Sequence, residues 1–162
     1  YSFRMLDEID LKILRMLQKD ARVSNSAMAR CTGMATSAIF ERIKKLKALG
    51  VIRGYRIDLE PRMLGMGLLA YVFVKVNIRR GQPDAALLLA EIPEVQEVHH
   101  IAGEDCLMVK IRAPDTGTLG DLLTEHIHCL EGVQSTRTTI VLKTVKDTAE
   151  LPLTYVGEMG KK

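Results

Sequence analysis

The sequence of 162 residues is long enough to form one domain or two small ones around an apolar core. Hydrophobic residues make up 47% of it and charged residues 27%, which excludes an intrinsically disordered chain. The longest mainly apolar run, Leu68 to Val76, contains Lys75 and is too short to span a bilayer, so we expect no membrane partner.

The net charge of +3 is unevenly distributed along the chain. Residues 1–62 hold 13 lysines and arginines against 7 acidic residues, whereas the remainder holds 10 against 13. A basic first part joined to a mildly acidic second part indicates that the first part meets phosphate. The cysteines, Cys31, Cys106 and Cys129, are too few for a disulfide framework, so we expect reduced thiols in a cytoplasmic protein.

The first helix is predicted over Leu6–Asp20. Three acidic residues stand in its opening turn, where they favour the positive end of the helix dipole. Apolar residues then recur every three or four positions and give the helix one apolar face. The acidic residues are Asp7, Glu8 and Asp10, and the apolar face holds Leu6, Ile9, Ile13, Met16 and Leu17.

Two further helices are predicted on either side of Gly33, over Asn25–Cys31 and Ala35–Leu49. Ser24 or Asn25 can cap the first of them, because short oxygen-bearing side chains accept hydrogen bonds from free backbone N–H groups. The second helix carries four basic residues and one acid. A short helix, a tight turn and a basic helix are typical of a helix-turn-helix, whose second helix enters the major groove of double-stranded DNA.

The N-terminal part of a recognition helix meets base edges, so Thr36, Ser37 and Phe40 are expected to read the DNA sequence. Basic side chains position the protein on phosphates without carrying sequence information. Ser24 and Asn25 can also donate to a phosphate, although capping explains them equally well. The basic residues expected at the DNA are Arg42, Lys44, Lys45 and Arg53.

A strand or strand pair is predicted over Val51–Asp58, directly after the third helix. A helix-turn-helix followed at once by such a strand is a winged-helix arrangement. Residues 62–68 lack periodicity and include two glycines, so they are interpreted as a linker. We therefore expect a winged helix-turn-helix domain over residues 1–61, with the helix-turn-helix itself at about residues 25–44.

Residues 69–146 alternate β-rich and helical patterns in the order β-α-β-β-α-β, and residues 147–162 are expected to form an irregular tail. Both helices end in similar segments, IPEVQ from Ile92 and LEGVQ from Leu130, which indicates two related halves. Such halves form a ferredoxin-like sheet with the helices on one face. The predicted strands are 69–78, 95–102, 106–112 and 133–145, and the predicted helices are 84–91 and about 116–130.

The other face of this sheet is expected to be partly apolar, with Tyr71, Phe73, Met108 and Val141 as candidates. An exposed apolar face of this kind favours a partner subunit. The expected fold class is therefore α+β: a winged helix-turn-helix followed by a ferredoxin-like βαββαβ domain that forms a dimeric α/β sandwich.

The histidines at 99–100 and at 126 and 128 look like metal ligands at first sight. Neighbours on a strand point to opposite faces, and helix residues two apart lie about 200° apart around the axis, so neither pair chelates one ion. The sequence also lacks a Ser/His/Asp or Cys/His set, a GxGxxG motif and a phosphate loop. We expect no metal, no cofactor and no catalysis.

Five segments together resemble the leucine-responsive/asparagine-responsive (Lrp/AsnC) family of prokaryotic transcription regulators. The resemblance covers residues 6 to about 146 and implies a DNA-binding domain joined to a domain for amino-acid sensing and oligomerisation. It further implies homodimers, joined through their sheets, that assemble into tetramers or octamers. The segments are LDEIDLKIL, LQKDARVSN, ERIKKLKALGVIRGY, the Gly103-Glu104 turn and TRTTIVL.

The resemblance also implies where an effector binds, namely between dimers, near the turn after the second strand and the start of the last strand. By position these residues are Gly103, Glu104, Asp105 and Cys106, with Thr136 and Thr138 opposite. The family turn usually has an aspartate where this chain has Cys106, and a neutral thiol cannot match the bond of a carboxylate to an ammonium group. Either the turn is rearranged, or the effector is not an ordinary amino acid, or there is none.

The leading hypothesis is a sequence-specific transcription regulator whose assembly responds to a small molecule, an amino acid by resemblance. One alternative is an architectural, chromatin-like protein that wraps DNA with little sequence preference, which predicts near-equal affinity for unrelated duplexes. The other is a ligand-binding or metabolic module on the ferredoxin-like half, which leaves the basic first part unexplained.

Overall fold

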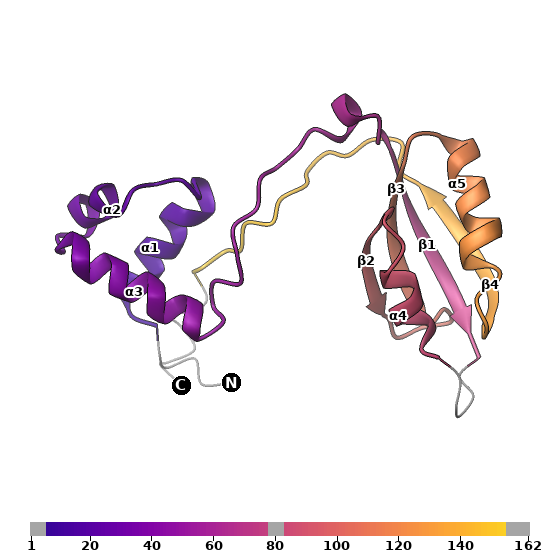
Figure 1. Ribbon diagram of the computed structural model, residues 1–162, viewed down its shortest axis with the longest axis horizontal. Coiled ribbons are helices and arrows are strands. Elements are labelled where there is room, and N and C mark those ends of the chain that lie inside the picture. The colour runs from indigo at the N-terminus through magenta and orange to yellow at the C-terminus, as the bar shows by residue number, and fades with distance from the viewer. Residues whose placement is uncertain (1–5, 78–82, 155–162) are drawn as a thin grey trace. The chain divides into compact units, whose positions relative to one another are not determined.

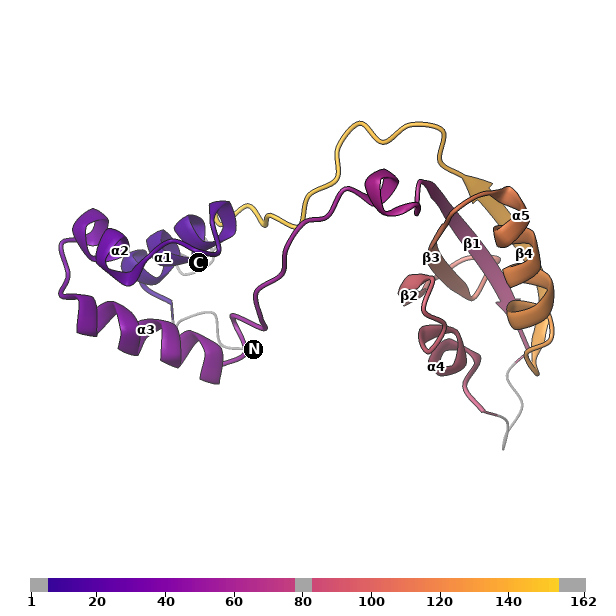
Figure 2. The ribbon, with the colours of Figure 1, turned by 45° about the horizontal axis from the view of Figure 1, so that its top comes forward.

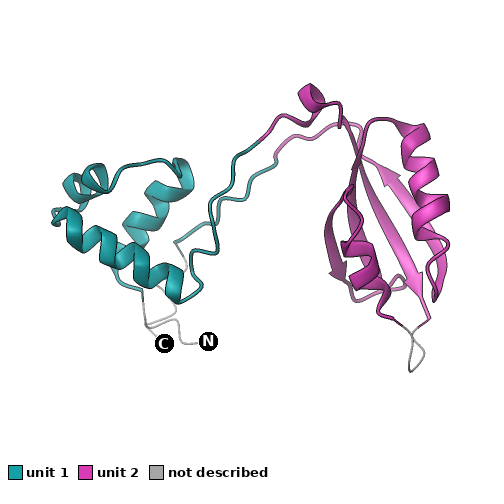
Figure 3. Ribbon diagram, in the orientation of Figure 1, with its two compact units in different colours: residues 1–58, 147–162 teal, residues 59–146 magenta. Residues whose placement is uncertain are grey.

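The computed structural model describes residues 6–77 and 83–154. The chain forms two compact units, residues 1–58 with 147–162 and residues 59–146, which are coloured separately in Figure 3. We call them the helical unit and the sheet unit. The sheet unit is one continuous stretch, whereas the helical unit is assembled from both ends of the chain. Among the described residues, no helix is long and apolar enough to cross a membrane.

The helical unit contains three helices, α1 (Glu8–Lys19), α2 (Asn25–Thr32) and α3 (Thr36–Ala48), shown in Figure 1. The three helices predicted from the sequence are confirmed, with ends that differ by one or two residues. Their apolar faces meet in one small core, as the helical periodicity requires. The most deeply buried members are Ile13, Met28, Ile39 and Leu46.

Side-chain caps explain where α1 and α2 begin. Asp7 and Asp10 form a capping box, in which each carboxylate accepts a hydrogen bond from the backbone N–H of the other, at 2.8 and 3.2 Å. Ser24 Oγ accepts from the N–H of Ala27 at 3.1 Å and caps α2. Gly33 then takes a φ of +72°, a left-handed conformation that glycine adopts without steric cost, and turns the chain into α3.

The prediction of a wing over Val51–Asp58 is wrong for the single chain, because residues 51–60 contain no strand. A strand requires hydrogen bonds to a neighbouring strand, and alternating apolar and polar residues do not by themselves supply that partner. The apolar side chains of the segment, such as Ile57 at 81% exposure, are left uncovered. A short 3₁₀ helix, η2 (Pro61–Leu64), follows this segment.

The sheet unit is a four-stranded antiparallel sheet in the order β2-β3-β1-β4, with both α-helices packed on one face (Figure 2). The predicted order β-α-β-β-α-β is confirmed, and so is the α+β class. The strands are β1 (Leu68–Val76), β2 (Val95–His100), β3 (Leu107–Ala113) and β4 (Val133–Ile140), and the helices are α4 (Ala85–Ala90) and α5 (Thr116–Leu122).

Alternation along the two central strands builds the core of the sheet unit. Val72 of β1 lies opposite Val109 of β3, and both are fully buried under the helices. Leu107 and Ile111 share this face with Val109, as the predicted alternation requires, while residues between them face the other side. Leu89 of α4 closes the core from above the sheet.

Two elements end earlier than predicted. The helix expected to run to residue 130 ends as α5 at Leu122 and continues as a π-helical turn, η3 (Leu123–Ile127), with wider hydrogen-bond spacing. β4 ends at Ile140 instead of Val145, because the pairing with β1 stops at Ala70. The predicted end of the first strand, Ile78, lies outside the described residues.

The sheet face opposite the helices is mixed in character. Tyr71, Phe73 and Met108 are half-buried on it, while the guanidinium of Arg137 lies 4.3 Å from the centre of the Phe73 ring. Val141 follows β4, and its N–H donates to the Leu69 carbonyl at 2.9 Å. The half-buried aromatic groups make this face chemically suited to a partner.

Candidate functional site

The N-terminal half of α3 presents an exposed surface. Ile39 and Ile43 face the core of the helical unit, so the opposite side of α3 is turned away from that core. Thr36, Ser37 and Phe40 are all exposed, and Phe40 keeps 55% of its surface uncovered although it is a large apolar residue. The structure therefore brings the three residues predicted to read bases onto one accessible face.

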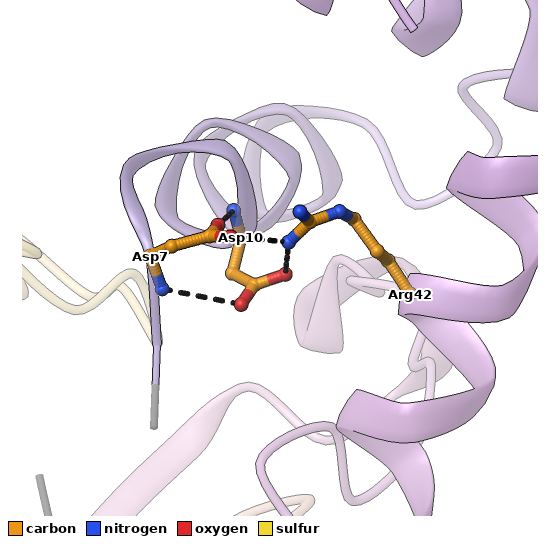
Figure 4. Close-up of polar contacts among 3 residues, drawn as sticks. All are labelled: Asp7, Asp10 and Arg42. Atoms are coloured by element: carbon orange, nitrogen blue, oxygen red, sulfur yellow. Dashed lines mark hydrogen bonds and ion pairs between the residues drawn. The ribbon is translucent and has the colours of Figure 1, made fainter. Parts of the chain in front are cut away.

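Arg42 has a different environment from the other basic residues of α3. Its Nη1 donates to Asp7 Oδ2 at 2.7 Å and to Asp10 Oδ1 at 2.8 Å, as Figure 4 shows. The side chain of Asp10 is only 8% exposed, so this pair is largely shielded from water. The clamp of Asp7, Asp10 and Arg42 joins the first turn of α1 to the middle of α3.

The clamp perturbs the ionisation of its members. The backbone N–H of Asp10 is the main cause that lowers the pKa of Asp7, burial acts against it, and Arg42 lowers it further. The pKa of Arg42 is raised, chiefly by its hydrogen bond to Asp10. Arg42 was predicted to contact phosphate, but its guanidinium here stabilises the packing of α3 on α1. Its partners lie 32 and 35 residues upstream, which charge patterning does not reveal.

The other basic residues predicted at the DNA are exposed. Lys44 and Lys45 lie on the outer side of α3, and Arg53 follows it. Of the two capping candidates, Ser24 caps α2, while Asn25 is half-buried in its first turn. Sequence reasoning missed a further contact, in which the Lys47 ammonium lies 4.9 Å from the centre of the Tyr55 ring.

The predicted effector turn is held by backbone bonds to the sheet. Cys106 N–H donates to the Val74 carbonyl at 3.1 Å, and its own carbonyl accepts from Ile101 at 3.0 Å. Its thiol packs against the core of the sheet unit and lies 3.6 Å from the Val76 carbonyl oxygen. Gly103 opens the turn with a positive φ of 155°.

The carboxylate of Asp105 is paired within its own chain. Its Oδ2 accepts from Arg137 Nη2 at 2.8 Å, and Arg137 in turn covers the Phe73 ring on the open sheet face. Asp105 is therefore directed to a cation of its own chain. Glu104 is exposed, and it forms no ion pair with the other residues that the structure describes.

Thr138 and Thr136 of β4 lie opposite Val72 and Val74, respectively, on the side of the sheet that carries the helices. Thr136 Oγ1 lies 2.7 Å from His128 Nε2, and Thr138 is exposed. Thr136 and His128 line a surface cavity of about 320 Å³ that the turn at Gly103 does not enter. The single chain thus brings only part of the predicted effector set together. His128 was interpreted from sequence as an ordinary histidine.

The histidines considered as metal ligands have other neighbours. His99 lies 3.2 Å from Glu97, which Lys110 also contacts at 3.0 Å. Lys110 is the main cause that lowers the pKa of Glu97, followed by His99. Across the described ranges, no three His, Cys, Asp or Glu side chains are grouped to hold a metal ion.

A basic recognition helix on a compact three-helix core, followed by a ferredoxin-like sheet, defines a helix-turn-helix DNA-binding regulator with an attached α+β domain. The model of the AsnC-type helix-turn-helix domain matches residues 6–47, and that of the Lrp/AsnC ligand binding domain matches residues 70–151. The chain belongs to the Lrp/AsnC family of transcriptional regulators, as its sequence resemblance predicts.

Individual relatives match nearly the whole chain. It is 40% identical over 148 residues to the HTH-type transcriptional regulator FL11 of Pyrococcus horikoshii, covering 91% of this chain and 97% of that protein. It is 37% identical over 150 residues to the leucine-responsive regulatory protein of Escherichia coli K12, covering 90% of each. A crystal structure of a Neisseria meningitidis transcriptional regulator in complex with L-methionine aligns with a TM-score of 0.86 and 28% identity, over 94% of this chain and 99% of that one.

Proposed function

We propose that this regulator reads specific DNA sites through the N-terminal face of α3. The observation that carries the proposal is the exposure of Thr36, Ser37 and Phe40 on a helix whose opposite face is fixed in a core. A hydroxyl can bond to a base edge, and an aromatic ring can contact a thymine methyl group. Both contacts require a helix that keeps its orientation, which the clamp to α1 supports.

Phosphate contacts in this proposal come from Lys44, Lys45 and Arg53, with Ser24 and Asn25 as hydrogen-bond donors beside the backbone. Each lysine that neutralises a phosphate releases a counterion, so binding weakens as salt rises. Arg42 is left out of this set, since its guanidinium is paired with Asp7 and Asp10.

A mobility-shift assay on the promoter region of its own gene tests sequence-specific binding. We expect a complex that resists excess unrelated duplex. Thr36→Val should reduce the ratio of specific to unrelated affinity, whereas Lys45→Ala should weaken both equally. Near-equal affinity of the native protein for all duplexes would instead indicate the architectural, DNA-wrapping alternative.

We further propose that a small molecule, an amino acid by analogy with the L-methionine complex of the Neisseria regulator, modulates assembly. The proposed site includes Gly103, Glu104, Asp105 and Cys106 of the turn and Thr136 and Thr138 of β4. The cavity beside Thr136 supports part of it. Since the turn residues do not line this cavity in one chain, the complete site requires a neighbouring subunit. The ligand acts only through different affinities for the two assemblies.

A thermal-shift screen of the amino acids tests the effector, because a bound ligand stabilises the native state by about 2.7 kcal/mol at 100 times its dissociation constant. Cys106→Asp restores a carboxylate at the altered position and should strengthen binding of an amino acid. Cys31→Asp, at an exposed cysteine of the helical unit, is the matched control. Unchanged binding by the folded Cys106→Asp variant in calorimetry would exclude Cys106 from the site.

The proposed assembly is a homodimer joined through the open sheet faces, which associates into tetramers or octamers. The half-buried Tyr71 and Phe73 on that face support it. Phe73→Asp should yield a folded monomer in light scattering, since a charge in an apolar interface is costly to desolvate. A native protein that is monomeric at micromolar concentration would contradict the proposal.

The proposed compartment is the cytoplasm. All three cysteines are free, and two of them, Cys31 and Cys129, are exposed. Exposed thiols persist in the reducing cytosol, where the chromosomal DNA of a prokaryote is also found. Localisation of a tagged, full-length protein by fractionation tests this statement.

A further inference from the structure

The helical unit contains a contact between residues 133 positions apart in the sequence. Gln18 Oε1, on α1, accepts from the N–H of Leu151 at 2.7 Å, and Gln18 Nε2 donates to the Leu151 carbonyl at 3.1 Å. The Gln18 side chain therefore pairs with both the N–H and the carbonyl of Leu151. A carboxamide has the same donor and acceptor as a peptide group, so Gln18 makes the two hydrogen bonds that a residue of a neighbouring β-strand would make.

The face of α1 that carries Gln18 is distinct from its core face. Leu11 lies seven residues before Gln18 and thus on the same side of the helix. It is only 3% exposed, although it is absent from the apolar core formed by Ile13, Met28 and Ile39. A second side of α1 is therefore covered, beyond the one that packs on α2 and α3. The described residues of the C-terminal segment, 147–154, belong to the same compact unit as α1.

The sequence around Leu151 is preorganised for this contact. Pro152 follows it, and a residue before proline is restricted to extended conformations. The hydroxyl of Thr148 accepts from the N–H of Glu150 at 3.1 Å and shapes the approach. The Leu151 side chain is 67% exposed, so its backbone, and not its side chain, is recognised.

We propose that the face of α1 around Gln18 is a docking site for the C-terminal segment of the same chain, residues 147–154. Docking anchors the segment noncovalently on α1, so the passage of the chain at residues 146–147 ties the helical unit to the sheet unit in addition to the passage at residues 58–59. With both connections held, the helical unit has fewer orientations available to it. The segment is thus a restraint on the DNA-binding helices, outside the DNA surface and the effector region.

Hydrogen exchange measured by mass spectrometry on the full-length protein tests the docking itself. Each hydrogen bond of this kind shifts the equilibrium between docked and free segment about five-fold. Gln18→Ala should therefore speed exchange of the Leu151 N–H, measured in a peptide that covers residues 147–154, on the order of ten-fold or more. Gln18→Glu keeps one acceptor but loses the donor, and should have an intermediate effect. Leu151→Ala, which keeps the backbone groups, and Lys12→Ala, on an exposed position of α1, should exchange like the native protein.

Equal exchange rates of residues 147–154 in the native protein and in Gln18→Ala would overturn the docking site. Protection of the α1 peptides reports whether the helix itself survives the substitution. Alanine has a higher helix propensity than glutamine, so α1 itself should remain closed in Gln18→Ala, and Gln18→Glu gives a second reading of the contact. A Leu151→Ala variant that loses protection would also contradict recognition of the backbone.

The consequence for DNA rests on the proposed function and is measured separately. Gln18→Ala should reduce affinity for a duplex with two half-sites by about three- to ten-fold and leave affinity for one half-site unchanged, because only the first needs two helical units in fixed orientation. Equal affinities of variant and native protein for the two-site duplex would overturn the restraint. Absence of any DNA binding would overturn the proposed function and leave the exchange result standing.

Discussion

The helical unit and the sheet unit are stabilised in different ways. In the sheet unit, alternating side chains of β1 and β3 meet the apolar faces of α4 and α5 in a continuous core. The helical unit has a smaller core and adds the clamp of Asp7, Asp10 and Arg42. Asp10 is the one buried charged residue among those described.

This difference is informative because burial of apolar area and ion pairing respond to different changes. An apolar core is sensitive to lost volume and insensitive to pH. A shielded ion pair is sensitive to loss of either partner, since the remaining charge is left in a poorly solvated place. Each unit should therefore have its own most damaging substitutions, and a substitution in one should leave the other folded.

The largest expected effect is on the sheet unit. Ile111→Ala removes a fully buried side chain from the middle of β3 and should lower the free energy of unfolding of that unit by roughly 3–4 kcal/mol. Denaturant titration followed by circular dichroism measures this loss. Ile140→Ala is the control, because Ile140 is 42% exposed at the end of β4 and should lose less than about 1 kcal/mol. Equal losses for both would contradict the assigned core.

The second prediction concerns the helical unit. Arg42→Met keeps the aliphatic stem but leaves Asp10 without its cation, and should lower the unfolding free energy of this unit by about 2 kcal/mol. We place the value below that of a fully buried pair because the Arg42 side chain is 26% exposed. Thermal unfolding measures it, with Lys45→Met as the exposed control. A folded Arg42→Met variant of native stability that loses DNA affinity would return Arg42 to the phosphate contacts.

The third prediction separates binding from stability. Lys44→Ala and Lys45→Ala should each weaken DNA binding by about ten-fold or less and reduce the slope of log affinity against log salt by about 0.9. Their thermal unfolding should match that of the native protein, because both side chains are exposed. Fluorescence anisotropy at several salt concentrations provides the slope. An unchanged slope would remove the lysine concerned from the interface.

The same contrast explains what the sequence could predict. The period of apolar residues identified the faces of α1 and α3 and the buried positions of β3, because local periodicity decides which side of an element meets a core. It could not pair Arg42 with Asp7 and Asp10, since pairing depends on how two helices cross. It also predicted a wing at Val51–Asp58, where the strand pattern is present but the chain supplies no partner strand.

The candidate effector residues also separate what the sequence indicates from what only the folded chain shows. The resemblance identified the turn at Gly103 and the threonines of β4, yet the partner of Asp105 could not be predicted. Arg137 reaches Asp105 because β4 lies beside β1, an arrangement that arises only in the folded sheet. The end of the α5 pattern in a π turn is likewise invisible to a count of apolar positions.

The smallest expected effect is a pH dependence of the helical unit that Asp7 sets. The pKa of Asp7 is lowered below its ordinary value of 3.8, first by the N–H of Asp10. A carboxyl whose folded pKa is depressed stabilises the fold above the ordinary pKa, and this contribution is lost as the pH falls through the lower folded value. The free energy of unfolding of the helical unit should therefore be constant above about pH 5 and decrease below about pH 4.

Asp7→Asn tests the origin of this dependence. The amide oxygen can still accept from the Asp10 N–H, but the charge opposite Arg42 is gone, so the variant should lose less than about 1 kcal/mol at neutral pH. Its unfolding should then change less between pH 5 and pH 3 than that of the native protein. Ile111→Ala, a substitution in the sheet unit, should leave the change in unfolding of the helical unit between pH 5 and pH 3 as it is in the native protein. If the helical unit of the Asp7→Asn protein kept the full native acid response, the dependence would belong to another carboxylate of that unit.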